Sequence, residues 1–320
     1  MARALRELGA EVLHFDPLAL ELERPVSELD GALRWDSQPV GELAGCYVCT
    51  LPSPFAELGA GPLLEPEARF VEAMRQRERA AFVFAWLLEL EARGTRLVNA
   101  LHAGSALQFK AFQLNVLRRL GAPVPPTLIS NEPAAVRAFA GRHPEVIFKP
   151  LTGGAETRLL DAAALARLEH LVAAPCIFQQ RVEGDDVRVT LVDGEVCSAV
   201  VIRTPAQALD YRADPVYAAG LASYVDVGLP PSVLQQCRAA AAQCGLVLAG
   251  VDLKRRPDGG FVFLELNSSP IYADVELKRG HHISEAIASA VLRRDVAKEL
   301  RVSTVSSVSP GWSGPSTGSG

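Results

Sequence analysis

The stretch that decides the fold runs from residue 245 to residue 270 and reads GLVLAGVDLKRRPDGGFVFLELNSSP. Two apolar segments flank Asp258-Gly259, a dipeptide that is typical of two-residue hairpin turns. Counting outward from this turn places Asp252 opposite Glu265 on two antiparallel strands. The stretch therefore predicts a β-hairpin that brings two carboxylates side by side.

These two carboxylates predict a cation site. Directly opposed side chains have Cβ atoms about 4.5–5.5 Å apart, so two ionised carboxylates repel each other unless a cation lies between them. Strand alternation puts Asn267 on the same face as Glu265, which adds an amide oxygen. Because Mg²⁺ prefers hard oxygen ligands, we predict a Mg²⁺ site at Asp252, Glu265 and Asn267, which Mn²⁺ would also fit.

The alternative is that these acids face solvent on an edge hairpin, where they need no metal. The residues that alternate with them are apolar, which predicts that the other face of the hairpin is core: Val251, Leu253, Leu264 and Leu266. Acids that stand out against such a background favour the metal site.

Composition limits the class of protein. The chain has 320 residues, of which 49% are hydrophobic and 22% charged, as in an ordinary globular protein with about two domains. A net charge of −5 argues against a nucleic-acid partner. No apolar run reaches the roughly 20 residues of a membrane helix, and Glu7 and Glu11 lie where a signal peptide needs an apolar core. We expect a cytoplasmic protein that contacts no membrane.

The pattern of elements predicts two domains and a tail. Residues 1–100 alternate helices (2–8, 65–93) with strands (11–15, 45–49, 96–99) and form a partial α/β domain whose first strand is missing. Residues 101–301 begin with a helix over 105–120 and continue as a mixed α+β domain with antiparallel hairpins. Residues 302–320 are rich in Ser and Gly and predict a disordered tail. The six cysteines lie mostly in apolar stretches, which favours buried, reduced thiols.

Two lysines precede the hairpin. Lys149 ends an apolar strand and is followed by Gly153-Gly154, where backbone N–H groups can approach phosphate oxygens, although no Walker A sequence follows. Lys110 lies in a helix between Phe109 and Phe112, a setting that also suits a surface lysine. By themselves these residues leave both interpretations open.

The order of these motifs resembles the ATP-grasp superfamily of ligases over roughly residues 97 to 293. The resemblance implies two α+β subdomains that clasp ATP, with Lys110 and Lys149 on the phosphates and Mg²⁺ on Asp252, Glu265 and Asn267. It implies further nucleotide contacts from Gly153, Gly154, Gln179, Gln180, Arg181, Val182 and Asp186. Three arginines match positions that steady phosphate or an acyl phosphate: Arg188, Arg203 and Arg212.

The implied activity is ADP-forming ligation of a carboxylate to an amine or a hydroxyl. The helix before LVNAL, the stretch FQLNVLRRLGAPVPPTLISNEPAAVRAF and DYR at 210–212 resemble graspetide synthetases of the microviridin type, which modify ribosomal peptides. The motifs DDVRV and ELNSSP equally resemble the ligases that add glutamate to ribosomal protein. We favour the graspetide type, so the expected substrate is a peptide or protein carboxylate.

Two other functions stay open: a small-molecule ligase of the glutathione or dipeptide type, and a nucleotide-binding scaffold without turnover. The complete set of two lysines, two carboxylates and one amide argues against the scaffold. Because ATP-grasp relatives are often dimers or tetramers, the resemblance also implies a homo-oligomer.

Overall fold

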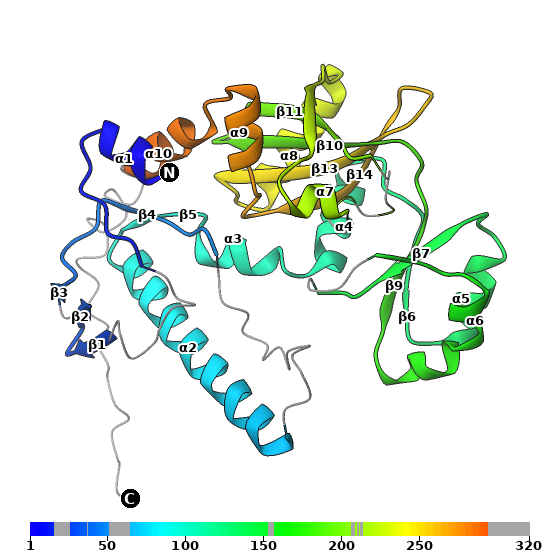
Figure 1. The fold of residues 1–320 in the computed structure, drawn as a ribbon, viewed down its shortest axis with the longest axis horizontal. Coiled ribbons are helices and arrows are strands. Elements are labelled where there is room, and N and C mark those ends of the chain that lie inside the picture. Colours follow the sequence, from blue (N-terminus) through cyan, green and yellow to red (C-terminus); the bar gives the residue numbers. More distant parts are fainter. Residues whose placement is uncertain are drawn as a thin grey trace, which may run out of the picture.

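The computed structural model describes residues 1–15, 26–36, 38–50, 65–152, 157–205, 209, 211 and 214–293. Its largest sheet has five antiparallel strands in the order β12-β11-β10-β13-β14 (Figure 1). These strands are β10 (Asp185–Val192), β11 (Glu195–Arg203), β12 (Ser223–Asp226), β13 (Leu248–Arg255) and β14 (Phe261–Asn267). The antiparallel hairpins expected in this half of the chain are confirmed.

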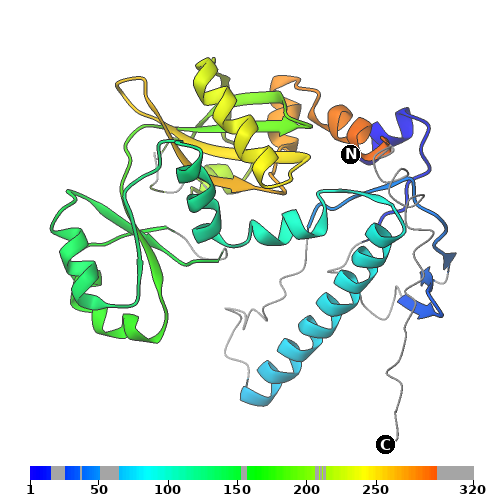
Figure 2. The same ribbon diagram turned by 180° about the vertical axis from the view of Figure 1, so that it is seen from behind.

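Strand alternation gives this sheet an apolar face and a polar face. Val187, Val189 and Leu191 of β10 point into the main core, where they meet Cys237 and Ala240 of α8 (Pro231–Gln243). Figure 2 shows α8 in front of this face. The residues between them, including Arg188, point to the other face, which carries α7 (Pro215–Ala218) and α9 (Ala273–Arg279).

A second, four-stranded sheet forms a small lobe (residues 127–180) to the right in Figure 1. Its strands run in the order β6-β9-β7-β8, with β6 (Thr127–Ser130), β7 (Val146–Lys149), β8 (Arg158–Leu159) and β9 (Cys176–Gln180). It is covered by α5 (Pro133–Ala140), α6 (Ala162–Ala166) and a 3₁₀ helix (Leu168–Ala173). The stretch 123–126, which contains three prolines, leads from the main core into this lobe.

The N-terminal part packs against one end of the five-stranded sheet. It contains α1 (Ala2–Glu7), a small sheet of β1 (Val26–Leu29), β2 (Ala32–Trp35) and β3 (Gln38–Pro39), a parallel pair of β4 (Gly45–Tyr47) and β5 (Arg96–Val98), and α2 (Pro66–Ala92). The last helix, α10 (Ile283–Leu292), packs on α1, β4 and β5. Within the described residues, no helix combines the length and the apolar character needed to cross a membrane.

Two sequence-based expectations in the first half of the chain are wrong. Residues 11–15 form no strand; Phe15 packs edge-on against Trp35 and Trp86, with ring centroids 4.5 and 4.8 Å away. The expected helix over 105–120 is two helices, α3 (Leu101–Ala106) and α4 (Lys110–Arg119). The Gln113 side chain donates to the carbonyl oxygen of Leu107 in the break between them. The expected tail at 302–320 lies outside the described residues.

The hairpin of β13 and β14 pairs Asp252 with Glu265 as expected, but by a different route. The turn has three residues, 257–259, closed by a hydrogen bond from Arg256 N to Gly260 O of 2.8 Å, and Gly259 has φ +82°. A β-bulge between Asp252 and Leu253 then shifts the register by one residue. The bulge inserts Leu264, which therefore faces the same side as Glu265 instead of the core.

Asn99 fastens the N-terminal part to the five-stranded sheet. Its Nδ2 donates to the carbonyl oxygens of Leu248 (2.7 Å) and Ser268 (2.6 Å), and its Oδ1 accepts from the N–H groups of Val247 (2.8 Å) and Leu248 (2.9 Å). The Asn99 side chain is buried, and its two bonds to Leu248 are shielded from water. Asn99 thus holds both the start of β13 and the residue that follows Asn267.

We predict that Asn99→Ala lowers the free energy of unfolding by about 3 kcal/mol or more, because it leaves buried carbonyl and N–H groups without partners. Urea denaturation measures this loss. Asn115→Ala, at an exposed position of α4, is the matched control and should change stability by no more than about 0.5 kcal/mol. Equal effects of the two substitutions would contradict the prediction.

Candidate active site

A cavity of about 590 Å³ lies between the small lobe and the polar face of the five-stranded sheet. The small lobe and the segment after it contribute Ile147, Lys149, Gln179, Gln180, Arg181 and Val182. The large sheet and its connections contribute Asp186, Arg188, Tyr211, Asp252, Lys254, Leu264, Glu265 and Asn267. The cavity therefore gathers most of the residues singled out in the sequence.

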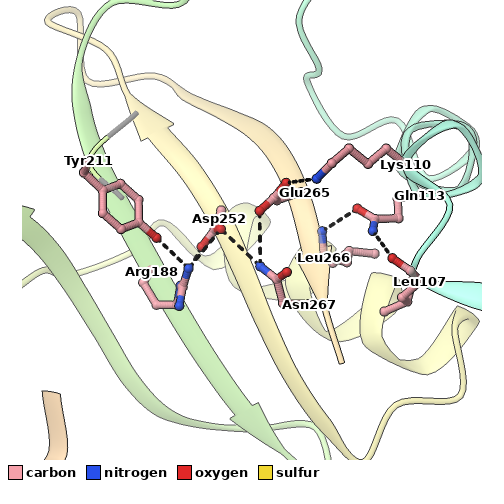
Figure 3. A network of polar contacts seen from close by, with 9 residues as sticks. All are labelled: Leu107, Lys110, Gln113, Arg188, Tyr211, Asp252, Glu265, Leu266 and Asn267. Carbon is pink, nitrogen blue, oxygen red and sulfur yellow. Dashed lines mark hydrogen bonds and ion pairs between the residues drawn. The ribbon is translucent and has the colours of Figure 1, made fainter. Parts of the chain in front are cut away.

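The two hairpin carboxylates and the amide converge inside this cavity (Figure 3). Asn267 Nδ2 lies 3.1 Å from Asp252 Oδ2 and 3.5 Å from Glu265 Oε1. The acids are largely buried, with 8% and 9% of their side chains exposed. The structure thus brings together three side chains that the sequence predicts as a metal site.

A different cation balances each of the two carboxylates. Lys110 Nζ lies 2.7 Å from Glu265 Oε2. Arg188 grips Asp252 with two hydrogen bonds, from Nε to Oδ1 (2.6 Å) and from Nη2 to Oδ2 (3.0 Å). Both side chains of this ion pair are buried, and the two parallel hydrogen bonds fix their relative orientation.

Local structure explains how Lys110 reaches the hairpin. The break after α3 makes Lys110 the first residue of α4, and the helix then packs along β14. Gln113, one turn later, accepts a hydrogen bond from Leu266 N at 3.0 Å and fixes this packing. Gln113 was missed in the sequence because its role depends on the helix break.

Tyr211 is a second side chain that sequence reasoning missed. Its hydroxyl oxygen accepts a hydrogen bond of 2.6 Å from Arg188 Nη2, and its ring meets Tyr217 edge-on, with centroids 4.8 Å apart. Both rings line the cavity beside Ile271, whose carbonyl oxygen also accepts from Arg188. Tyr211 belongs to the DYR stretch at 210–212, but this pattern does not indicate a contact with Arg188, because Tyr211 lies in the connection between β11 and α7.

The opposite wall is formed by the end of β9 and the residues after it. Gln179 is buried and donates to Thr127 Oγ1 at 3.0 Å, which ties β9 to β6. Arg181 pairs with Glu145 at 3.1 Å, while Gln180 and Val182 also line the cavity. Lys149 ends the neighbouring strand β7 and lines the cavity too.

Lys254 adds a cation that sequence reasoning missed. It lies directly opposite Asp186 in the pairing of β10 with β13, and its Nζ is 2.9 Å from Asp186 Oδ1. Lys254 follows Asp252 by two residues, so strand alternation would have placed it on the cavity face. Both partners line the cavity.

One expected site residue lies away from this cavity. Arg203 is on β11, where it pairs with Asp185 at 2.6 Å and does not line the cavity among the described residues. Burial raises the pKa of Asp185, but the hydrogen bonds and charges of Arg255 and Arg203 outweigh it and hold this pKa below its usual value. Gly153, Gly154 and Arg212 lie outside the described residues.

The six cysteines are free thiols and contribute nothing to this cavity. Burial raises the pKa of Cys237 to about 12 and that of Cys46 to about 11, so both thiols stay protonated at neutral pH. The described residues hold no cluster of three or more His, Cys, Asp or Glu side chains suited to a metal. The candidate metal site consists of two carboxylates and one amide.

Comparison with known proteins identifies relatives of this chain. Residues 114–255 match the family described as prokaryotic glutathione synthetase, ATP-grasp domain. A protein of Shewanella pealeana named "Probable alpha-L-glutamate ligase" is 25% identical over 70% of this chain, which spans 51% of that relative. "Probable alpha-L-glutamate ligase 1" of Hahella chejuensis is 29% identical over 67% of this chain and 73% of its own length. The chain thus spans about half the length of the first of these relatives.

Solved structures extend the likeness to nearly the whole chain. The ATP-grasp ligase PsnB complexed with a minimal precursor is 32% identical, with a TM-score of 0.74 over 91% of this chain and 93% of that chain. The macrocyclase MdnC of Microcystis aeruginosa, bound with its precursor peptide MdnA, is 21% identical and shares the fold, with a TM-score of 0.73 over 91% of this chain and 94% of its own. The chain belongs to the ATP-grasp ligases, and the expected ATP-grasp fold is confirmed.

The buried ion pair yields a test of stability. Arg188→Met should lower the free energy of unfolding by about 3–5 kcal/mol, because it leaves the Asp252 charge buried without its main partner. Arg203→Met should cost less than about 1 kcal/mol, because Arg203 is 45% exposed and Asp185 keeps Arg255. Denaturant unfolding of both variants at pH 7 measures the difference, and similar losses would contradict it.

Proposed function

We propose that this protein is an ATP-dependent ligase that activates a carboxylate as an acyl phosphate and joins it to an amine or a hydroxyl of a peptide. The observation that carries the proposal is the convergence of two carboxylates and an amide with lysines from two other elements in one cavity. The likeness to PsnB over most of both chains supports a peptide substrate, since that ligase was solved with a precursor.

The donor set fits Mg²⁺. Two carboxylates leave coordination positions for water and phosphate oxygens, which is the usual arrangement for this ion. The Asn267 amide points at both acids, and turning it about its last bond presents its oxygen. Asp252, Glu265 and Asn267 would hold Mg²⁺, which when bound would neutralise charge on the phosphate oxygens. PsnB was also solved with Mg and ADP, at 34% identity to this chain.

The cavity walls suggest how the nucleotide is held. The segment Gln179–Val182 offers backbone groups to an adenine ring, as the family resemblance implies, and Leu264 adds an apolar surface from the opposite wall. Lys110 and Lys149 approach from α4 and β7, where two positive charges offset those of a polyphosphate. The phosphates then lie over the hairpin carboxylates.

The proposed reaction has two steps. A carboxylate oxygen of the substrate bonds to the γ-phosphorus of ATP while the bond from that phosphorus to the bridging oxygen breaks, which gives an acyl phosphate and ADP. The amine or hydroxyl then bonds to the acyl carbon, phosphate leaves with the electrons of the carbon–oxygen bond, and the proton that the acceptor loses ends on the released phosphate. Of Arg188 and Arg203, Arg188 lines the cavity, so we assign Arg188 to the developing oxyanion.

A second candidate is the addition of free amino acids to a protein carboxylate. It is favoured by the names of the sequence relatives, which are called alpha-L-glutamate ligases. The two candidates share the acyl-phosphate step and differ in the acceptor.

Nucleotide binding is the first prediction of this proposal. Mg²⁺ with ADP at a hundred times its Kd should stabilise the protein by about 2.7 kcal/mol and raise its Tm by several degrees. Glu265→Gln and Lys149→Ala should reduce the shift. Glu169→Gln is the matched control, because Glu169 is exposed on the small lobe and does not line the cavity. No shift of the wild-type Tm at millimolar ADP and Mg²⁺ would reject the proposal.

The product distinguishes the two candidates. With ATP, Mg²⁺ and a peptide that carries both acidic and Ser, Thr or Lys residues, we expect loss of one water per linkage in the mass spectrum. Addition of a glutamate residue to the peptide would instead support the second candidate. The Glu265→Gln protein, incubated in parallel, should give neither product.

A further inference from the structure

Strands β10 and β13 form two cross-strand ion pairs on the cavity face, each of which is one rung of the strand pairing. In the first rung Arg188 of β10 faces Asp252 of β13, and in the second Asp186 of β10 faces Lys254 of β13. The signs are exchanged between the rungs, so each strand presents one acid and one base to the cavity. Because residues two apart on a strand are separated by about 7 Å, the second rung lies one step along the wall from the metal site.

Along β10, the step from Arg188 back to Asp186 leads toward the segment Gln179–Val182. Asp186 follows this segment closely in the chain, whereas Asp252 and Glu265 are at the phosphate end of the proposed site. In every adenine nucleotide the ribose lies between the base and the phosphates. A nucleotide bound as proposed therefore places its ribose at the second rung.

Asp186 has the chemistry to recognise that sugar. An ionised carboxylate only accepts hydrogen bonds, and the 2′ and 3′ hydroxyls of ribose are donors on neighbouring carbons. The side chain must be held in one orientation to use this match. Lys254 supplies the restraint, because its Nζ lies 2.9 Å from Asp186 Oδ1 and also donates to the carbonyl oxygen of Gly184 at 3.3 Å.

We propose that Lys254 is a positioning residue for ribose: it aims the Asp186 carboxylate at the sugar hydroxyls and so makes the protein select ribonucleotides over 2′-deoxyribonucleotides. The ammonium group also offsets the negative charge of Asp186, which would otherwise face the phosphates about 7 Å away. The proposal rests on the proposed function only in that an adenine nucleotide occupies the cavity.

The test is the ratio of the Kd for 2′-deoxyADP to the Kd for ADP, measured by calorimetry on the full chain with Mg²⁺. Loss of a hydrogen bond to a charged group predicts a wild-type ratio of about ten or more. In Lys254→Met the ratio should fall to about three or less, and Lys254→Arg should restore part of it. A substitution that destabilised the protein but left the Asp186 carboxylate in its orientation would not change this ratio.

The chain offers a matched control. Arg255 is the next residue on β13, pairs with Asp185 at 2.6 Å and does not line the cavity, so Arg255→Met breaks an ion pair on the other face of the same strand. It should keep the wild-type ratio. Asp186→Asn should lower the ratio as Lys254→Met does, and the double variant should lower it no further, because the two residues act as one unit.

The outcomes separate this inference from the function it rests on. A Lys254→Met protein that keeps the wild-type ratio, or that loses affinity for both nucleotides by the same factor, would overturn the role of Lys254. A wild-type ratio near one would overturn ribose selection itself. A wild-type protein that binds neither nucleotide would overturn the proposed function, and this inference with it.

Discussion

Two like charges that face each other in a buried hairpin are the constraint on which the rest of this structure depends. Asp252 and Glu265 cannot stay together in the interior without cations, and the fold delivers Lys110 from a helix start and Arg188 from a neighbouring strand. Each cation is in turn fixed, Lys110 by the packing of its helix and Arg188 by Tyr211. The site is therefore built by contacts between elements distant in the chain.

The bulge at Leu264 gives this hairpin an apolar surface on its cavity face. A regular strand alternates, so a leucine next to Glu265 would point into the core. The extra residue turns both side chains to the cavity and places an apolar surface beside a charged one. A bound nucleotide needs both surfaces, since its base is apolar and its phosphates are charged.

How far the sequence predicts this site depends on whether the deciding contact is local. The pairing of Asp252 with Glu265 was predicted from a two-residue turn, yet the turn has three residues and the bulge restores the register. Strand alternation predicted that Asn267 lies on the same face as Glu265, and the same rule would have placed Lys254 on the face of Asp252. Tyr211 and the break before Lys110 follow from tertiary packing, which no short pattern encodes. The same holds for Phe15, whose aromatic contacts replace an expected strand.

Asn99 bears on how such ligases can be recombined. Composition and element order suggest a domain boundary near residue 100, which would assign Asn99 to the N-terminal domain. Its four hydrogen bonds, however, go to the start of β13, the strand that carries Asp252, and to Ser268, which follows Asn267. A chimera that joins the first 100 residues of one relative to the remainder of another must therefore inherit this asparagine together with its backbone partners. The junction that is apparent in the sequence is therefore crossed by four hydrogen bonds, one of which ends at the residue that follows Asn267.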